Sequence, residues 1–461
     1  MVSIKNKLTI PQNAYKNLLQ IVQKFEEKGN QCYLVGGSVR DLIMNSQAFD
    51  YDLATDARPE TVMGLFRKAI PTGIKHGTVS VILNKQTFEI TTYRSDGKYL
   101  DGRHPETVSF SDTLEEDVQR RDFTINGLAY DLIRETIIDY VDGYADLKKK
   151  IIRTIGEPIE RFAEDGLRPL RACRFAAKLK FEIEEKTFAA ITSSLPVVQK
   201  VSAERIRDEL MKLMETEKPS VGLDKMRESG LLDLVLPELS TAFNISQNRF
   251  HKYDIYYHSV LSCDAAPRDK PILRLAALLH DIGKVPTRRP GPNGDSTFYN
   301  HEVLGAKMTR KIMKRLKFSN EQIEKVNNLI INHMFHYTDE WTDGAVRRFI
   351  RKVGLESIND LITLRLADRI GNGARCGLPA PIETLMDKIR TVIDADNAFS
   401  IRDLDIDGNV IMGSFNLHSG PIIGTILNEL LEMVLDNPEL NKREILIQKA
   451  GEIMDKHTVK R

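Results

Sequence analysis

A change of pattern near residue 150 constrains the fold of this 461-residue chain more than any single motif. Before it, a helical pattern over 12–29 leads to the strand QCYLVGG, the helix SVRDLIM and the strand FDYDLAT. A helix at PETVMGLFRKA and an antiparallel hairpin of GTVSVIL and TFEITTYR follow. From about residue 156 onward nearly every segment has helical periodicity. The sequence therefore predicts an α+β chain, with a small mixed α/β head followed by a mostly α-helical body.

The overall charge identifies no partner. Lys plus Arg number 66 and Asp plus Glu 65, so binding of nucleic acid would depend on a local basic surface. Cys32, Cys173, Cys263 and Cys376 form no CxxC pair, which argues against a zinc knuckle or a disulfide framework. The amino terminus lacks the apolar core of a signal peptide, and no run is long enough to span a bilayer. We expect a cytoplasmic protein with no membrane partner.

Two acids two residues apart, Asp50 and Asp52, lie in FDYDLAT. On an alternating strand they would point to the same side and repel each other. A solvated strand end is the alternative for an isolated pair of this kind, but a hard divalent cation would also make the pair stable. Mg²⁺ prefers oxygen ligands together with substrate phosphates. With Glu89 as a third acid on the hairpin, the pattern predicts catalysis of two-metal phosphoryl transfer.

The segment LVGGSVRD places a diglycine turn, Gly36 and Gly37, between a strand and a helix. Glycine lets the backbone approach a ligand closely, and a helix start offers free N–H groups to phosphate. Ser38 can add a hydroxyl and Arg40 a cation. Most turns of this type are only turns, so the prediction of a nucleotide site depends on the neighbouring motifs.

The order LVGGSVRD, FDYDLAT, RRDFTINGLAYD, EDGLRPLRACRF resembles the class II tRNA nucleotidyltransferases, the bacterial CCA-adding enzymes of the polymerase-β superfamily. The resemblance is strong over about the first 240 residues and looser beyond them. It implies a polymerase-β-like head that completes the tRNA 3′ CCA end from CTP and ATP without a template and releases pyrophosphate. Carried over position by position, it implies magnesium bound by Asp50 and Asp52, and nucleotide contacts from Gly37, Arg40, Arg121, Asp122 and Asn126.

The helix predicted at EDGLRPLRACRF would place Asp165 and Arg168 on one face. A surface ion pair, worth tenths of a kcal/mol, is the alternative. The resemblance implies a protein template, since aspartate can accept from the amino group of C or A while arginine donates to the ring nitrogen. Guanine and uracil would mismatch both contacts. Arg171 and Arg174 would extend toward the phosphates, and Pro169 requires the helix to begin or kink here.

Six of the ten histidines fall between positions 251 and 336. Isolated histidines on apolar helices are usually core residues, but LAALLHDIGK and its outlying ligands resemble the HD phosphohydrolase domain. Imidazole and carboxylate ligands suit Mn, Fe, Ni, Co or Zn. Lys284 could face phosphate, and damaged or cyclic-phosphate RNA ends are candidate substrates. The resemblance implies one metal held by His258, His280, Asp281 and Asp368, and a second at His301 and His333.

These patterns give four predicted domains: a nucleotidyltransferase head, a nucleotide-selecting neck, the HD domain and a tRNA-binding tail. The loop 94–110 is of full length, which favours complete CCA addition over a CC-only product. Three alternatives remain: a class II poly(A) polymerase, an HD phosphohydrolase whose head only binds nucleotides, and a non-catalytic RNA-binding protein. The predicted boundaries are 1–150, 151–245, 246–375 and 376–461.

Overall fold

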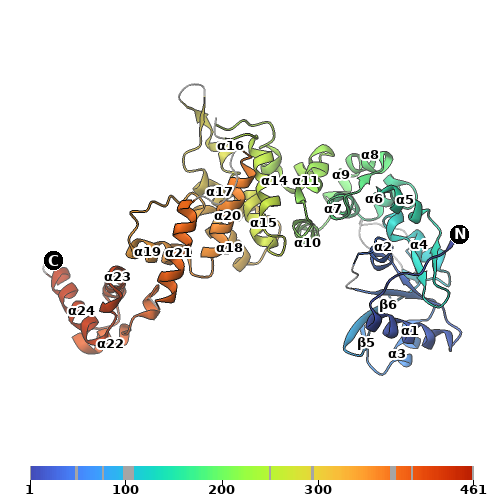
Figure 1. Ribbon diagram of the computed structural model, residues 1–461, viewed down its shortest axis with the longest axis horizontal. Coiled ribbons are helices and arrows are strands. Elements are labelled where there is room, and N and C mark those ends of the chain that lie inside the picture. Colours follow the sequence, from blue (N-terminus) through green and yellow to red (C-terminus); the bar gives the residue numbers. More distant parts are fainter. Residues whose placement is uncertain are drawn as a thin grey trace. The chain divides into compact units, whose positions relative to one another are not determined.

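A mixed sheet forms the centre of the head in the computed structural model (Figure 1). The structure describes residues 2–46, 50–74, 77–96, 108–248, 251–291, 295–373, 380–395 and 398–458. The sheet's eight described strands have the order β1-β10-β9-β2-β3-β6-β5-β4, in which only β3 and β6 run parallel. They are β1 (Val2–Lys5), β2 (Cys32–Val35), β3 (Asp52–Thr55), β4 (Ala69–Gly73), β5 (Thr78–Leu83), β6 (Gln86–Thr92), β9 (Ala129–Asp131) and β10 (Thr136–Asp139).

Apolar side chains hold the sheet against its helices. In α1 (Gln12–Glu26) the spacing of Leu18, Ile21, Val22 and Phe25 gives one buried face. Burying a side chain of this size stabilises the fold by roughly 1.5–3 kcal/mol. The short α2 (Gly37–Ile43) and α3 (Pro59–Leu65) begin directly after strands β2 and β3 and the turns that follow them. The turns at the ends of these strands are therefore set on a rigid core.

Helices follow the head and complete the first of two compact units, Met1–Ser240 with Arg315–Lys317. The central helix α7 (Arg168–Leu179) packs against α10 (Ala203–Met214) and α11 (Pro219–Glu228). The remaining elements are β7 (Arg94–Asp96), β8 (Val108–Phe110), α4 (Leu114–Gln119), η2 (Thr124–Asn126), α5 (Gly143–Lys149), β11 (Ile151–Ile152), α6 (Pro158–Glu164), β12 (Glu182–Ile183), α8 (Glu185–Ser193), α9 (Leu195–Val198), α12 (Leu231–Val235) and α13 (Pro237–Ser240).

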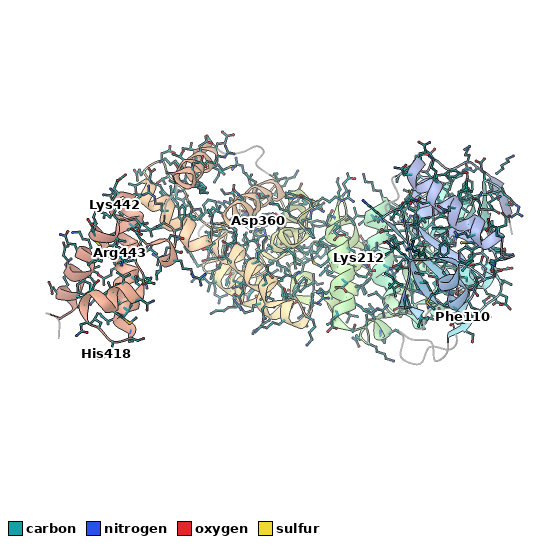
Figure 2. The ribbon with its side chains drawn as sticks, turned by 90° about the horizontal axis from the view of Figure 1, so that it is seen from below. Phe110, Lys212, Asp360, His418, Lys442 and Arg443 are labelled. Carbon is teal, nitrogen blue, oxygen red and sulfur yellow. The ribbon has the colours of Figure 1, made fainter. Side chains whose placement is uncertain are left out.

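The second unit, Thr241–Lys314 with Phe318–Arg461, is almost entirely helical in its described residues. Asp360, labelled in Figure 2, pairs with Lys270 (2.7 Å) and Lys325 (2.8 Å) and so ties three helices together. The elements are α14 (Ile255–Ala265), α15 (Pro271–Leu279), α16 (Lys284–Thr287), β13 (Arg289–Pro290), β14 (Ser296–Thr297), α17 (His301–Arg315), α18 (Asn320–Asn332), α19 (Asp343–Val353), α20 (Ile358–Gly371), α21 (Ala380–Asp394), η4 (Ile401–Asp403), α22 (Gly408–Phe415), α23 (Pro421–Asp436), η5 (Pro438–Leu440) and α24 (Arg443–Thr458).

The α+β fold class, the mixed head and the helical body are confirmed, as is the antiparallel hairpin of β5 and β6. Two local predictions are wrong. Strand β3 begins at Asp52, so Asp50 lies before the strand and not on it. Helix α7 begins at Arg168, so Asp165 shares no helical face with Arg168. The four-domain division, finer than the two compact units, stays a prediction.

Two other expectations concern the cysteines and membranes. Cys32, Cys173 and Cys263 are buried and form no disulfide, while Cys376 lies outside the described residues. Of the described helices, none combines the length and apolar character needed to cross a bilayer. The loop on which complete CCA addition was predicted, 94–110, has only its ends described, where β7 and β8 pair antiparallel; residues 97–107 lie outside the described residues.

Candidate functional site

Three carboxylates gather where β3 begins. Asp52 is the first residue of this strand, and Glu89 lies directly opposite it on the parallel neighbour β6. Both side chains reach solvent. Partial burial raises the pKa of the Asp52 carboxyl, and Glu89 and Asp50 raise it further against the opposing effect of Arg121. The oxygens of the three acids do not all lie within 4.8 Å of one another. The site is a group of like charges that a divalent cation would neutralise.

The diglycine turn lies beside an arginine from another segment. Gly36 has a φ of 76°, which favours glycine, and a Cβ there would lie 3.1 Å from Nη1 of Arg121. The Ser38 hydroxyl is buried and donates to the Val35 carbonyl (3.0 Å), so it closes the turn. Arg40 is 2% exposed and donates to Asn126. Arg121 is therefore the cation placed against the backbone of this turn.

A buried acid that the sequence analysis missed aims Arg121. Asp117, 1% exposed on α4, accepts from Arg121 (2.8 Å) and from Arg120 (2.6 Å). Burial raises the pKa of the Asp117 carboxyl, but the two guanidinium groups lower it below its usual range overall. The spacing of three and four residues on a helix was the available signal.

A hydrogen-bond network continues from the turn into the helices. Asn126 donates to Asp122 (2.9 Å), whose second oxygen accepts from Nε (2.9 Å) and Nη2 (2.7 Å) of Arg171. Arg171 also donates to Glu209 on α10 (3.2 Å), and Arg174 pairs with the same carboxylate. Glu209 is 3% exposed and was likewise missed. The network holds α7 at one fixed rotation relative to the RRDFTIN segment.

Replacing Glu209 with alanine should strongly destabilise this unit, because it leaves the buried arginines 171 and 174 short of a counter-ion. We expect a loss of about 3–5 kcal/mol in the free energy of unfolding, measured by denaturant titration. Glu217→Ala is the matched control, because its pair with Lys180 is exposed at 61% and 64%. That change should cost less than about 1 kcal/mol. Equal effects of the two substitutions would contradict the structural role of Glu209.

Asp122 should make the unit sensitive to acid. Burial raises the pKa of this carboxyl, but Arg171 and Asn126 lower it to about 2 overall. A pKa below the unfolded value near 3.8 gives stability that is complete above pH 4 and lost as the pH falls toward 2. The contribution is about 2 kcal/mol. Unfolding curves of Asp122→Asn between pH 5 and 2 should be flatter than those of the wild type.

The two residues predicted to read the base have other partners in this structure. Asp165 follows α6 in an extended conformation and accepts from Arg205 (2.8 Å). Arg168 is 7% exposed and donates to Glu164 (2.6 Å) and to two backbone carbonyls (2.9 Å each). Pro169 in the first turn disfavours helix in the preceding residues, which explains why α7 starts at Arg168.

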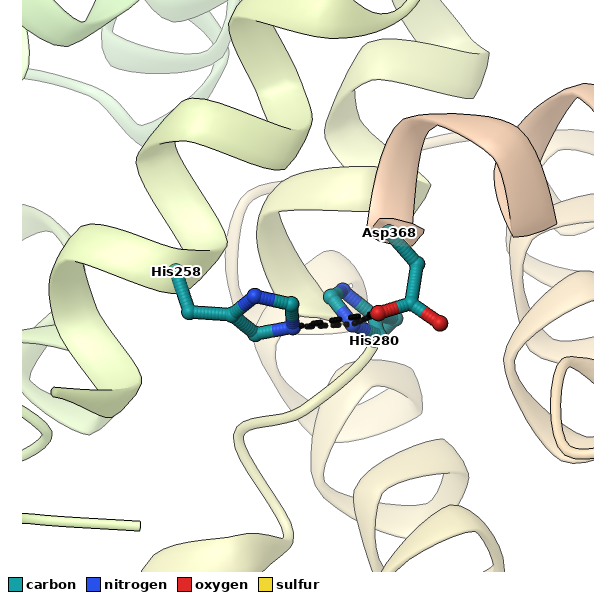
Figure 3. A group of neighbouring side chains, drawn as sticks. All are labelled: His258, His280 and Asp368. Carbon is teal, nitrogen blue, oxygen red and sulfur yellow. Dashed lines mark hydrogen bonds and ion pairs between the residues drawn. The ribbon is translucent and has the colours of Figure 1, made fainter. Parts of the chain in front are cut away.

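The second unit brings the histidines and aspartates of the HD motif together. Nε2 of His258 and Nε2 of His280 lie 3.1 Å apart, and Oδ1 of Asp368 lies 3.3 Å and 3.7 Å from them (Figure 3). A second group joins His280 and Asp281 with His333. The contributing elements are α14 for His258, the end of α15 for His280 and Asp281, α17 for His301, the end of α18 for His333 and α20 for Asp368.

The outer nitrogens of three imidazoles are held by backbone. Nδ1 of His280, His301 and His333 each lies 2.6–2.7 Å from the carbonyl three residues earlier. A ring that donates from Nδ1 carries its lone pair on Nε2, the form that binds a metal. Burial lowers the pKa of His333 to about 3, which keeps that ring neutral. These rings are prepared as ligands.

Asp281 lies between the two groups. Its Oδ2 is 3.0 Å from Nε2 of His258 and 2.6 Å from Nζ of Lys284. Its Oδ1 is buried without a hydrogen bond, as is Nε2 of His301 at 3.2 Å. Although burial lowers the pKa of His280, the carboxylates of Asp281 and Asp368 raise it to about 10. Unpartnered buried donor atoms that converge in this way fit a metal ion.

A cavity of about 850 Å³ opens over these ligands, within the second unit. Lys284, Arg365 and Arg369 contribute cationic side chains to its lining, and Arg365 pairs with the second oxygen of Asp368 (2.8 Å). A cavity with metal ligands on its floor and cations on its wall suits an anionic phosphoester.

Comparison with known proteins agrees with this division. The family described as "Poly A polymerase head domain" matches residues 32–153, "Probable RNA and SrmB- binding site of polymerase A" matches 180–243, and the HD domain matches 251–373. Head, RNA-binding region and HD domain together define a nucleotidyltransferase of the tRNA-processing type. The chain belongs to the family of CCA-adding enzymes, as the following relatives show.

It is 31% identical over 447 residues to the CCA-adding enzyme of Enterococcus faecalis, covering 96% of this chain and 97% of that relative. With the enzyme of Lactobacillus johnsonii it shares 32% over 419 residues, covering 91% and 92%. The crystal structure of the Bacillus stearothermophilus CCA-adding enzyme in complex with CTP matches with 26% identity and a TM-score of 0.74, covering 97% and 100%. A Thermotoga maritima CCA-adding enzyme complexed with tRNA, at 20% identity and TM-score 0.58 (96% of each chain), shares the fold.

Proposed function

We propose that this chain adds C, C and A in order to the 3′ end of tRNA, taking the nucleotides from CTP and ATP. The observation that carries the proposal is the register of Asp52 opposite Glu89, beside a glycine turn that Arg121 contacts. The tRNA 3′ oxygen forms a bond to the α-phosphorus, and the bond from that phosphorus to the pyrophosphate oxygen breaks. Attack and departure both leave negative charge on oxygen, which cations stabilise.

Each residue of the head has a proposed role in this reaction. Asp50, Asp52 and Glu89 hold magnesium, which when bound activates the 3′ hydroxyl and binds the triphosphate. Arg121 donates to the triphosphate, and Asp117 keeps that guanidinium in place (2.8 Å). The backbone at Gly36 and Gly37, with Ser38 and Arg40 behind it, shapes the nucleotide side of the turn, with Asp122 and Asn126 below.

We propose that Asp165 and Arg168 select the base, aided by Arg171 and Arg174. Asp165 and Arg168 would have to exchange their present partners, Arg205 and Glu164, for the Watson–Crick edge of the incoming nucleotide. Cytosine and adenine then satisfy both contacts, and guanine and uracil satisfy neither.

A single incubation tests the main proposal. The full chain is mixed with tRNA that lacks its CCA end and all four nucleoside triphosphates, and the product ends are sequenced. We expect ends that stop at CCA, because C and A alone fit the proposed protein template. Long A tails without C would instead identify a poly(A) polymerase, and ends that stop at CC would contradict the prediction drawn from loop 94–110.

A second activity is favoured by the HD cavity. We propose that His258, His280, Asp281 and Asp368 hold one transition metal and that His301 and His333 hold a second, for hydrolysis of a phosphoester. Bound metal supplies an activated water. Lys284 has its Nζ 2.6 Å from Asp281, on the cavity wall, where it can also approach a substrate phosphate.

A further inference from the structure

A second hollow, of about 430 Å³, lies next to the HD cavity in the same unit. It is formed by the end of α18, the segment after it and the exposed side of α19. Glu302, Met334, Phe335 and His336 line both hollows, so the two are continuous at these residues. A ligand whose phosphate lies over the HD metals would therefore extend into this second hollow.

The wall of the second hollow is aromatic. The ring centroids of Trp341 and Phe349 lie 5.4 Å apart at 70°, and those of Phe335 and Phe349 lie 5.1 Å apart at 48°. Edge-to-face contacts of this kind hold each ring in one orientation. Met334 and Ile331, also in the lining, are 52% and 41% exposed although they are apolar. The hollow thus offers fixed rings and uncovered apolar surface to a flat ligand.

The rim of the hollow carries a cation. Lys352 of α19 lines it and is exposed, and none of the described carboxylates pairs with it. Arg348, in the same lining, is already bound to Glu432 (2.9 Å) and Asp436. A neutral apolar ligand would leave Lys352 unused, whereas an anionic ligand with a planar ring would use both features.

We propose that the substrate of the HD site carries a nucleobase, which enters this hollow and stacks on the Trp341 ring while its phosphate lies over Asp281. The inference rests on the phosphohydrolase activity proposed above and adds the substrate class, a nucleoside phosphoester. Stacking is tolerant of sequence because every base has a π-face. The same chemistry is offered by a free nucleotide and by the last nucleotide of an RNA.

Binding can be measured without any hydrolysis, because Trp341 is the chain's single tryptophan. We expect AMP to quench the tryptophan fluorescence of the full chain, with Zn²⁺ added, in a saturable way, and ribose 5-phosphate to leave it unchanged. Lys352→Ala should weaken AMP binding several-fold. Lys442→Ala, which removes a 66% exposed lysine elsewhere in the unit (Figure 2), should not. Equal responses to AMP and ribose 5-phosphate, or none to AMP, would overturn the proposal.

Turnover then separates this inference from the activity on which it depends. Trp341→Ala should raise KM for a nucleoside phosphoester about 10-fold and leave a base-free phosphoester unaffected, while Trp341→Phe keeps the wild-type KM. Equal losses on both substrates would overturn the base subsite. If neither substrate is hydrolysed, the phosphohydrolase proposal fails, and the fluorescence titration still decides base binding. Comparing AMP with an oligoribonucleotide that ends in a 3′-phosphate shows which source binds more tightly.

Discussion

Asp52→Asn should abolish most nucleotide addition while the protein stays folded. Removing one ligand of the magnesium site should lower the rate of C and A addition about 10²- to 10⁴-fold, because the metal supplies several kcal/mol of charge stabilisation in the transition state. The measurement is incorporation of labelled CTP and ATP into tRNA lacking CCA. Asp112→Asn is the control, since that side chain is 88% exposed and pairs only loosely with Arg58 (3.4 Å).

The stability of the same variant distinguishes a lost ligand from a damaged fold. Partial burial, Glu89 and Asp50 raise the pKa of Asp52, so at neutral pH its charge opposes folding in the absence of metal. The neutral asparagine should therefore unfold at the same temperature as the wild type or higher. An inactive variant with a lower melting temperature would contradict this view, and so would an active one. Phosphoester hydrolysis by the HD site should be unchanged, because its ligands all lie in the other unit.

Local patterns in the sequence were sufficient for much of this architecture. The hairpin of β5 and β6 follows from alternation and a short polar turn, and α1 follows from its apolar spacing. The position of Glu89 opposite Asp52 was less accessible, since the parallel pairing of β3 with β6 joins strands separated by α3, β4 and β5. Sequence order indicated proximity, and only the sheet register gives direct opposition.

Long-range pairing explains what the sequence analysis missed or misplaced. Glu209 lies 35 residues beyond Arg174 and 38 beyond Arg171, and no periodic pattern links an acid to arginines at such distances. Arg168 had been interpreted by its spacing from Asp165, but its guanidinium is held by Glu164 and by the Arg120 carbonyl, which belongs to another segment. Residue types in the candidate sites were therefore predictable from motifs, whereas the partner of each side chain required the folded chain.

Asp281→Asn should remove both the metal and the hydrolytic activity of the second unit. This carboxylate places one oxygen near His258 and Lys284 and the other near His301, so an amide would supply only one acceptor to two groups of ligands. We expect bound Mn²⁺ or Zn²⁺, measured by elemental analysis after gel filtration, to fall from one or two ions per chain to near zero. His418→Gln, which changes an exposed histidine in the tail, should retain the wild-type metal content.

Metal removal should also destabilise the wild-type protein and leave the variant unaffected. A ligand that binds only the folded state at about 1,000 times its Kd adds about 4 kcal/mol, so EDTA should lower the melting temperature of the wild type and added metal should restore it. The effect should weaken as the pH falls, because protons compete for imidazole and carboxylate. Asp281→Asn should show one melting temperature under all these conditions, since it has no metal to lose. A wild-type melting temperature that EDTA leaves unchanged, with no metal in the purified chain, would mean that these buried histidines only pack, and the hydrolase assignment would fall with them.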